Sequence, residues 1–145
     1  MELQPIDPQT NGPQLLYGLR YHTHITKPEQ VKTYHDQVGY WLWEPATGQI
    51  IHTLTIPRGQ TVLASGKAKA DARQFTLTAT RGDMTSGICS NPWLDANFRT
   101  DSFTITVTVH DDGTWSYDED TVMQINGQDE PFHHCDTNQI GRAHV

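Results

Sequence analysis

The chain has 145 residues and a mass of 16.4 kDa, which suits one domain built around one packed core. Its formal net charge is −7 with 10 Lys and Arg, which argues against a general binder of nucleic-acid backbones, because such proteins need a positive face. No apolar run is long enough for a transmembrane helix, and the N-terminus lacks the basic and apolar regions of a signal peptide. We therefore expect a cytoplasmic protein with neither a nucleic-acid partner nor a membrane partner.

The amino-acid composition favours β structure, and the number of cysteines indicates a reducing compartment. Thr, Gln, Gly, Pro, Trp and Tyr are abundant, a mixture more typical of sheets and turns than of helices. The two cysteines, Cys89 and Cys135, are too few for a disulfide framework, and we expect both to be free thiols.

The N-terminal part is predicted to contain an irregular segment followed by strands. Residues 1–14, rich in Pro, Gln and Asn, are predicted to be a lead-in that forms no packed element. A strand over 15–25 ends at Lys27–Gln30, which we expect to form a turn or a short helical stub. Further strands are expected over 38–43, 49–56, 60–66 and 74–80.

The C-terminal half shows the clearest alternation. In 103–110, Phe103 and every second residue after it are apolar, whereas Thr and His occupy the other face. Asp111–Gly113 and Asn126–Gly127 are typical hairpin turns, which predict strands over 114–125 and from 130 to about 142. Only 82–97 is ambiguous between one helical turn and a lid.

About eight closely spaced strands with short turns predict an antiparallel meander that closes into a barrel or stacks as a sandwich. We favour the barrel, because each strand carries large apolar groups on one face and Thr on the other. The expected fold is an all-β, antiparallel up-and-down barrel of the calycin or lipocalin type over 15–145. A barrel of this size encloses one small ligand.

Histidine is unusually frequent, with 8 residues in the chain. His22 and His24 share a strand face, and with His52 or His110 they could form a zinc site. Histidines on such a face are more often solvated or hydrogen-bonded across strands, and the spacing fixes no third or fourth ligand. His133 and His134 are adjacent in a strand, so that one points inward and the other outward.

The sequence gives little support for a nucleophilic hydrolase, a phosphate-binding site or catalysis by paired acids. The chain has no Gly-x-Ser-x-Gly motif and no phosphate-binding loop, and its acidic pairs fit turns and solvent-facing positions. Trp41 and Trp43 share a face and are more typical of a core or a barrel plug than of a binding platform.

Three segments resemble the nitrobindin-like family of haem-binding β-barrels. Tyr34–Trp41 (YHDQVGYW) is similar to the family's His-x-Glu-x-Gly-aromatic segment, and Ile56–Gly66 (IPRGQTVLASG) to the turn and Val-rich strand that follow it. Phe132–Ile140 (FHHCDTNQI) is similar to the family's ending, in which a histidine precedes the last short strand. The likeness extends from about Leu15 onward and is greatest to a bacterial branch once described as fatty-acid-binding-protein-like.

The resemblance implies a role for several residues. His134 would be the proximal ligand of the haem iron, with His133 as the competitor for that place. His35 matches a histidine near the open side of the iron, and Met123 matches a methionine near the haem. From the residues alone, His35 could instead satisfy a loop carbonyl, and Met123 could be ordinary barrel filling. The cofactor-binding residues implied are His134, His35, Met123, Ile56, Gly59 and Phe132.

Two departures from the family pattern stand out. The Glu expected two residues after the first histidine is Gln37, which weakens any role that requires a charge. Family members also open with a Gly-x-Trp strand and a second strand, whereas only 14 residues precede Leu15 here. We therefore expect a barrel that lacks N-terminal wall strands and has an open seam with unpaired backbone groups.

Three functions remain open from the sequence. The resemblance implies a ferric haem b protein that handles nitric oxide or isomerises peroxynitrite to nitrate, with His35 as a catalytic hydrogen-bond donor. The alternatives are a non-catalytic carrier of a lipid or other apolar small molecule, and a truncated barrel without a ligand. A homo-oligomer is compatible with each of these functions.

Overall fold

A computed structural model describes residues 1–26 and 33–140 of the chain. These residues form a single antiparallel sheet and one short helix. The elements are β1 (Glu2–Asn11), β2 (Gln14–Thr26), β3 (Thr33–Glu44), β4 (Gln49–Ile56), β5 (Gln60–Lys67), β6 (Gln74–Thr80), β7 (Ile88–Ser90), α1 (Pro92–Asn97), β8 (Phe98–Val109), β9 (Trp115–Ile125) and β10 (Phe132–Ile140).

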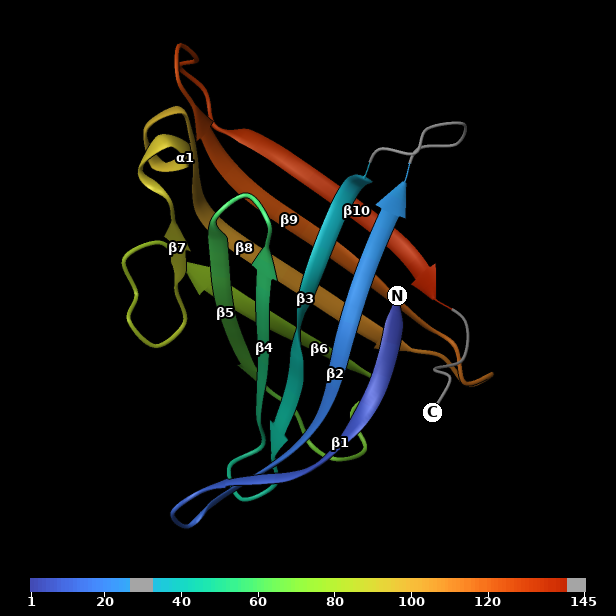
Figure 1. Cartoon of the computed structure of the whole chain (residues 1–145). Helices are drawn as coiled ribbons and strands as arrows, with labels where there is room; N and C mark the ends of the chain where they lie inside the picture. Colours follow the sequence, from blue (N-terminus) through green and yellow to red (C-terminus); the bar gives the residue numbers. More distant parts are fainter. Residues whose placement is uncertain (27–32, 141–145) are drawn as a thin grey trace.

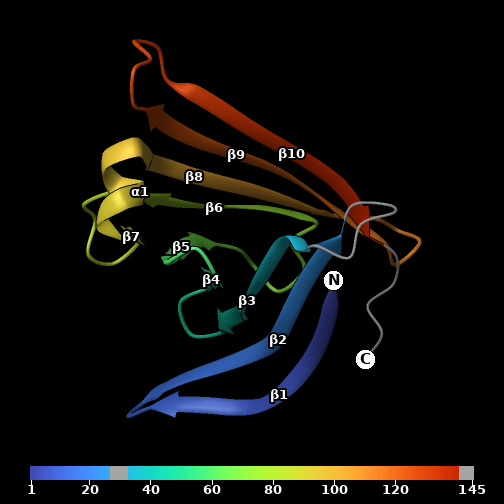
Figure 2. The same ribbon diagram turned by 45° about the horizontal axis from the view of Figure 1, so that its top comes forward.

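The strands follow one another around the sheet almost in chain order. The order is β1-β2-β3-β4-β5-β6-β8-β9-β10, and β7 pairs with β5 beside this path. Figure 1 shows the sheet curling around a common interior, and Figure 2 shows it bent like a letter C with β1 at one edge and β10 at the other. The all-β, antiparallel up-and-down barrel predicted from the sequence is confirmed, in a curled and open form.

The concave face of the sheet carries the core. Strand alternation turns every second side chain of each strand toward this face. The core cluster draws on strands from β2 to β9. It consists of Tyr21, Ile50, Leu54, Val62, Ala64, Leu77, Ala79, Phe103, Ile105, Val107 and Tyr117. Trp41 and Trp43 pack against it, as expected for core residues.

The predicted turns and the ambiguous segment are resolved. Gly113 and Gly127 adopt φ of 83° and 87°, which hairpin turns require and which glycine tolerates without strain. The segment 82–97 contains strand β7 and the single helical turn that was one of its two expected forms. The predicted turn or stub at Lys27–Gln30 and the end of the last predicted strand beyond Ile140 lie outside the described residues.

The prediction of an irregular lead-in over 1–14 is wrong. Residues Glu2–Asn11 form strand β1, which pairs along its length with β2. Its Pro5 and Pro8 hid the strand in the sequence, because proline lacks an N–H for the ladder and is tolerated mainly at sheet edges and bulges. β1 is an edge strand, and its register shifts between Ile6 and Gln9, around Pro8.

The barrel has a seam between its first and last strands. Among the described residues, no backbone pairing joins β10 to β1 or β2. An open seam was expected, although one more wall strand is present than the sequence suggested. No helix in the described part of the chain has the length and apolar character needed to cross a bilayer.

Candidate functional site

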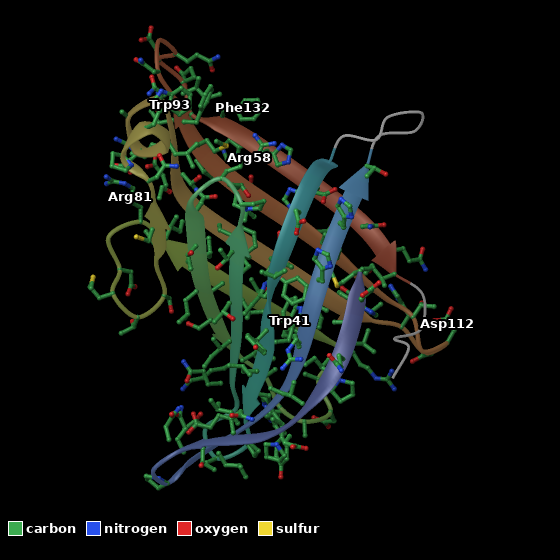
Figure 3. All side chains as sticks on the ribbon, in the orientation of Figure 1. Trp41, Arg58, Arg81, Trp93, Asp112 and Phe132 are labelled. Atoms are coloured by element: carbon green, nitrogen blue, oxygen red, sulfur yellow. The ribbon has the colours of Figure 1, made fainter. Side chains whose placement is uncertain are left out.

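The candidate residues gather at one end of the curled sheet. β3 begins at this end two residues before His35, β4 ends there with Ile56, and β9 and β10 meet there in a hairpin. The strands alternate in direction around the sheet, which places all these termini at the same end. Figure 3 shows Arg58, of the β4–β5 turn, and Phe132 toward this end and Asp112 away from it.

The two adjacent histidines of β10 lie on opposite faces of the sheet. His134 pairs with Thr121, which shares the concave face with Tyr117 of the core. His133 lies on the convex face, where its Nδ1 is 3.1 Å from the carboxylate of Asp120. No hydrogen bond joins the His134 ring to another described residue. The inward imidazole at this end is therefore that of His134.

Accessible apolar side chains extend from His134 along the concave face toward the end of β9. Phe132 pairs with Met123 beside it and is 44% exposed, and Phe98, across from Ile125, is 39% exposed. Trp93 of α1 packs its ring 5.5 Å from that of Phe98 and is 59% exposed. Accessible aromatic surface on an inward face suits a flat apolar ligand that covers it.

Part of this surface could not be predicted from the sequence because of a β-bulge. In β8 the register shifts between Thr100 and Ser102, so one extra residue reverses the alternation. Counting back by twos from the inward Phe103 places Phe98 on the convex face, whereas the bulge at Asp101 returns it to the concave face. A bulge leaves no reliable signal in one sequence.

Two further residues link the candidate positions into a continuous row. Gln60 pairs with Ile56, and its side-chain amide donates to Thr100 Oγ1 at 2.9 Å and to Ser90 Oγ at 3.0 Å. Thr100 in turn pairs with Met123, which pairs with Phe132. A row of neighbouring residues therefore runs across the sheet from Ile56 to Phe132 at this end of the barrel.

Gly59 has a structural place in the β4–β5 turn. Its φ is 80°, and a Cβ at this position would lie 2.7 Å from Asn91 Nδ2. Asn91 uses that nitrogen to donate to the Arg58 carbonyl oxygen at 2.7 Å. Gly59 thus allows the residue that precedes α1 to lie against the turn.

His35 belongs to a hydrogen-bonded series that leads into the core. Its Nε2 lies 3.1 Å from Gln37 Oε1, and the Gln37 amide donates to the Tyr21 hydroxyl. That hydroxyl lies 2.7 Å from His52 Nε2, and Tyr21 and His52 are each 1% exposed. The His52 ring stacks on Trp41 with 3.8 Å between ring centroids.

Burial sets the protonation of the inner members of this series. It lowers the pKa of His52 to about 3 and raises the pKa of Tyr21. Both side chains are therefore neutral at physiological pH. His52 Nδ1 and Trp41 Nε1 are buried without a hydrogen-bond partner among the described residues.

The wall formed by β9 and β10 carries carboxyl groups. Glu119 pairs with Asp136 on the concave face. Burial, and secondarily the charge of Asp136, raises the pKa of Glu119 to about 7. Burial also raises the pKa of Tyr117 to about 12, and its hydroxyl lies 3.5 Å from Asp136 Oδ2.

The histidines of the zinc hypothesis are not brought together. His22 and His24 stack on the convex face with 6.0 Å between ring centroids, and His22 Nε2 lies 3.0 Å from Asp36 Oδ1. His52 lies in the core, and His110 bonds to Ser116 Oγ. Among the residues described, no group of His, Cys, Asp and Glu side chains is arranged to hold a metal ion.

Comparison with family models gives one match that covers nearly the whole chain. The model of the THAP4-like, heme-binding beta-barrel domain matches residues 3–142. The chain belongs to this family. The match confirms the resemblance to nitrobindin-like haem-binding barrels and includes the N-terminal strand β1. No curated protein matches the chain.

The side chains at the open end fit the family's haem. A haem needs an imidazole, an apolar slot and a rim that reaches water. His134 is an imidazole without a protein partner in the described structure, Phe132 and Met123 provide apolar surface beside it, and Phe98 continues that surface further along the sheet. A hollow of about 770 Å³ elsewhere on the sheet, across β1–β4 around Gly39, is lined by Tyr21 and His22 among others, but by none of the residues implied to bind haem.

Proposed function

We propose that this haem-binding barrel holds a ferric haem through His134 and handles nitric oxide or isomerises peroxynitrite to nitrate. The observation that carries the proposal is the imidazole of His134, which lies exposed on the concave face beside accessible aromatic surface and has no hydrogen-bond partner among the described residues. Ferric iron with one protein ligand supplies an open position at which such small molecules coordinate.

The chain's own residues have separate tasks in this proposal. His134, on a strand, is held in place by the ladder of β9 and β10. Phe132, Met123 and Phe98 would cover the apolar faces of the macrocycle and exclude water from them. His35, near the beginning of β3, would contact the small ligand.

The proposed cofactor is the non-covalent form, haem b. Covalent attachment as in c-type proteins uses a Cys-x-x-Cys-His segment, and Cys89 and Cys135 are not arranged in this way. Both cysteines are also exposed free thiols.

Titration of the purified chain with hemin tests the ligand assignment. We expect a Soret band for the wild type and, for His134→Ala, a loss of affinity of at least about tenfold, because the nitrogen that would hold the iron is removed. His133→Ala is the matched control, since the neighbouring ring lies on the convex face, and it should bind hemin like the wild type.

An unchanged spectrum and affinity in His134→Ala would remove His134 from the site. Native mass spectrometry of freshly isolated protein distinguishes the haem protein from the alternative function, a carrier of a lipid or other apolar molecule. A bound mass other than that of haem, together with no Soret band, would support this carrier.

A further inference from the structure

The series from His35 to His52 has a defined direction of hydrogen bonding. Gln37 turns Oε1 toward His35 Nε2 and its amide nitrogen toward the Tyr21 hydroxyl. A carbonyl oxygen only accepts, so His35 must donate from Nε2. The Gln37 N–H fills one acceptor site of the phenol, whose own proton is left for His52 Nε2.

His52 is a rigid and neutral end point for this series. Its ring lies at 9° to the Trp41 ring and is 1% exposed. Because burial lowers the pKa of His52 to about 3, its Nε2 lone pair remains available to Tyr21.

The same end point argues against proton conduction. A proton relay needs an exit to solvent or to another titratable group. His52 Nδ1, the next atom along the series, is buried and has no partner among the described residues. A closed series of this kind orients its first member, His35, which is the one at the open end of the barrel.

We propose that Gln37, Tyr21 and His52 are positioning residues that hold His35 as the Nε2–H tautomer, so that His35 offers Nδ1 as an acceptor to the bound ligand. The tautomer is a property of the chain alone, whereas its use on a ligand rests on the proposed haem function. As an acceptor, His35 favours the binding of water or of a small ligand that carries a proton to donate to Nδ1. This differs from the donor role that the family resemblance implies.

The proposal also gives a physical reason for Gln37. A carboxylate at this position would accept the proton of His35 Nε2, but it has no N–H to give to the Tyr21 oxygen. Glutamine does both, which makes the series continuous from His35 to His52.

Nitrogen-15 NMR of the ligand-free chain, above the ordinary histidine pKa, reads the tautomer directly. We expect His35 to be the Nε2–H form in the wild type and a mixture of tautomers in Tyr21→Phe, which frees the Gln37 amide to rotate. Tyr17→Phe is the control, because Tyr17 lies on the same strand but is 48% exposed. A wild-type His35 protonated at Nδ1, or a tautomer unaffected by Tyr21→Phe, overturns the proposal.

Variants of Gln37 test the proposal independently, in case Tyr21→Phe does not fold. Gln37→Leu should mix the tautomers, whereas Gln37→Glu should keep the Nε2–H form, because the carboxylate still accepts that proton. Loss of the Nε2–H form in Gln37→Glu, with the amide spectrum intact, contradicts the assignment. If Gln37 had only a structural role, Gln37→Leu and Gln37→Glu would have the same effect on the protonation of His35 Nε2.

Fluoride affinity of the hemin-loaded protein tests the use of the tautomer. Bound fluoride gains from a neighbouring N–H donor, so His35→Ala should change its affinity by no more than about twofold if His35 is an acceptor. A loss of about tenfold would show that His35 donates and would overturn the acceptor assignment. A chain without a Soret band defeats the proposed function, while the NMR result still decides the tautomer.

Discussion

Gly39 allows β3 to approach β4 more closely than any other residue would permit. Its φ lies outside the left-handed region, so the reason for glycine is space alone. A Cβ at this position would overlap the Thr53 carbonyl oxygen, which is backbone and cannot rotate away. We predict that Gly39→Ala lowers the free energy of unfolding by about 2–4 kcal/mol, measured by urea denaturation.

Gly18→Ala is the matched control for this prediction. Its Cβ would meet Leu42 Cδ2 at 2.6 Å, the end of a side chain that has other rotamers, whereas the nearest backbone atom, the Trp41 carbonyl oxygen, lies at 3.1 Å. The cost should be clearly smaller than at Gly39. Equal costs at the two positions would mean that the backbone contact at Thr53 is not what requires glycine.

The histidines show what alternation can and cannot predict. Adjacent strand residues face opposite sides, and the structure confirms this for His133 and His134. His52 was a candidate zinc ligand, yet it is a core residue bonded to Tyr21. Burial of a polar ring depends on a partner from another strand, which a single sequence does not reveal. The roles of His35 and Met123 at a haem remain predictions.

The helix α1 depends on its cap and on the β4–β5 turn. Asn91 Oδ1 accepts from the backbone N–H groups of Trp93 and Leu94 at 2.9 and 3.1 Å, and its Nδ2 donates to the Arg58 carbonyl. We predict that Asn91→Ala destabilises the chain by about 1–2 kcal/mol, because it removes all three hydrogen bonds. Thermal unfolding followed by circular dichroism measures the loss.

Asn91→Asp separates the cap from the link to the turn. Aspartate keeps the acceptor for the two N–H groups but cannot donate to Arg58. We expect it to cost less than Asn91→Ala. If both variants were as stable as the wild type, the cap would not hold α1 beside the site.

At the level of elements, the regular strands were predicted and the irregular ones were not. Strands with strict alternation, such as β6 and β8 beyond its bulge, appear over their predicted ranges. β1 was missed because its two prolines and two glutamines resemble a loop, although pairing with β2 makes it a strand. The bulge at Asp101 was missed because it is set by the neighbouring strand.

Glu119 and His52, on two different walls of the barrel, contribute to the pH dependence of stability in opposite senses. Burial and Asp136 raise the pKa of Glu119 to about 7 from 4.5. Between these values the folded chain still holds the proton that the unfolded chain has released, so this group lowers stability as pH rises. We predict that Glu119→Gln, compared with the wild type, adds about 2 kcal/mol at about pH 8 and little near pH 4.5.

Urea denaturation at the two pH values checks this difference. His52 acts in the opposite sense, since its lowered pKa costs stability as pH falls from 6.5 toward about 3. It is present in both proteins and cancels in the comparison. Glu130→Gln, an exposed carboxyl in the β9–β10 connection, is the control. An equal gain at both pH values would show that the proton of Glu119 is not involved.

The sequence by itself determined most of the strands and turns, the family resemblance and the inward or outward alternation of His133 and His134. These follow from local rules: side chains alternate along a strand, and glycine permits the turns. Only the tertiary structure decided that 2–11 is a wall strand, that Phe98 and Thr100 face the concave side, and that Tyr21 and Gln37 connect His35 to a buried His52. Each of these depends on pairing between distant segments, because a neighbouring strand fixes register and supplies the partner that a buried polar group requires.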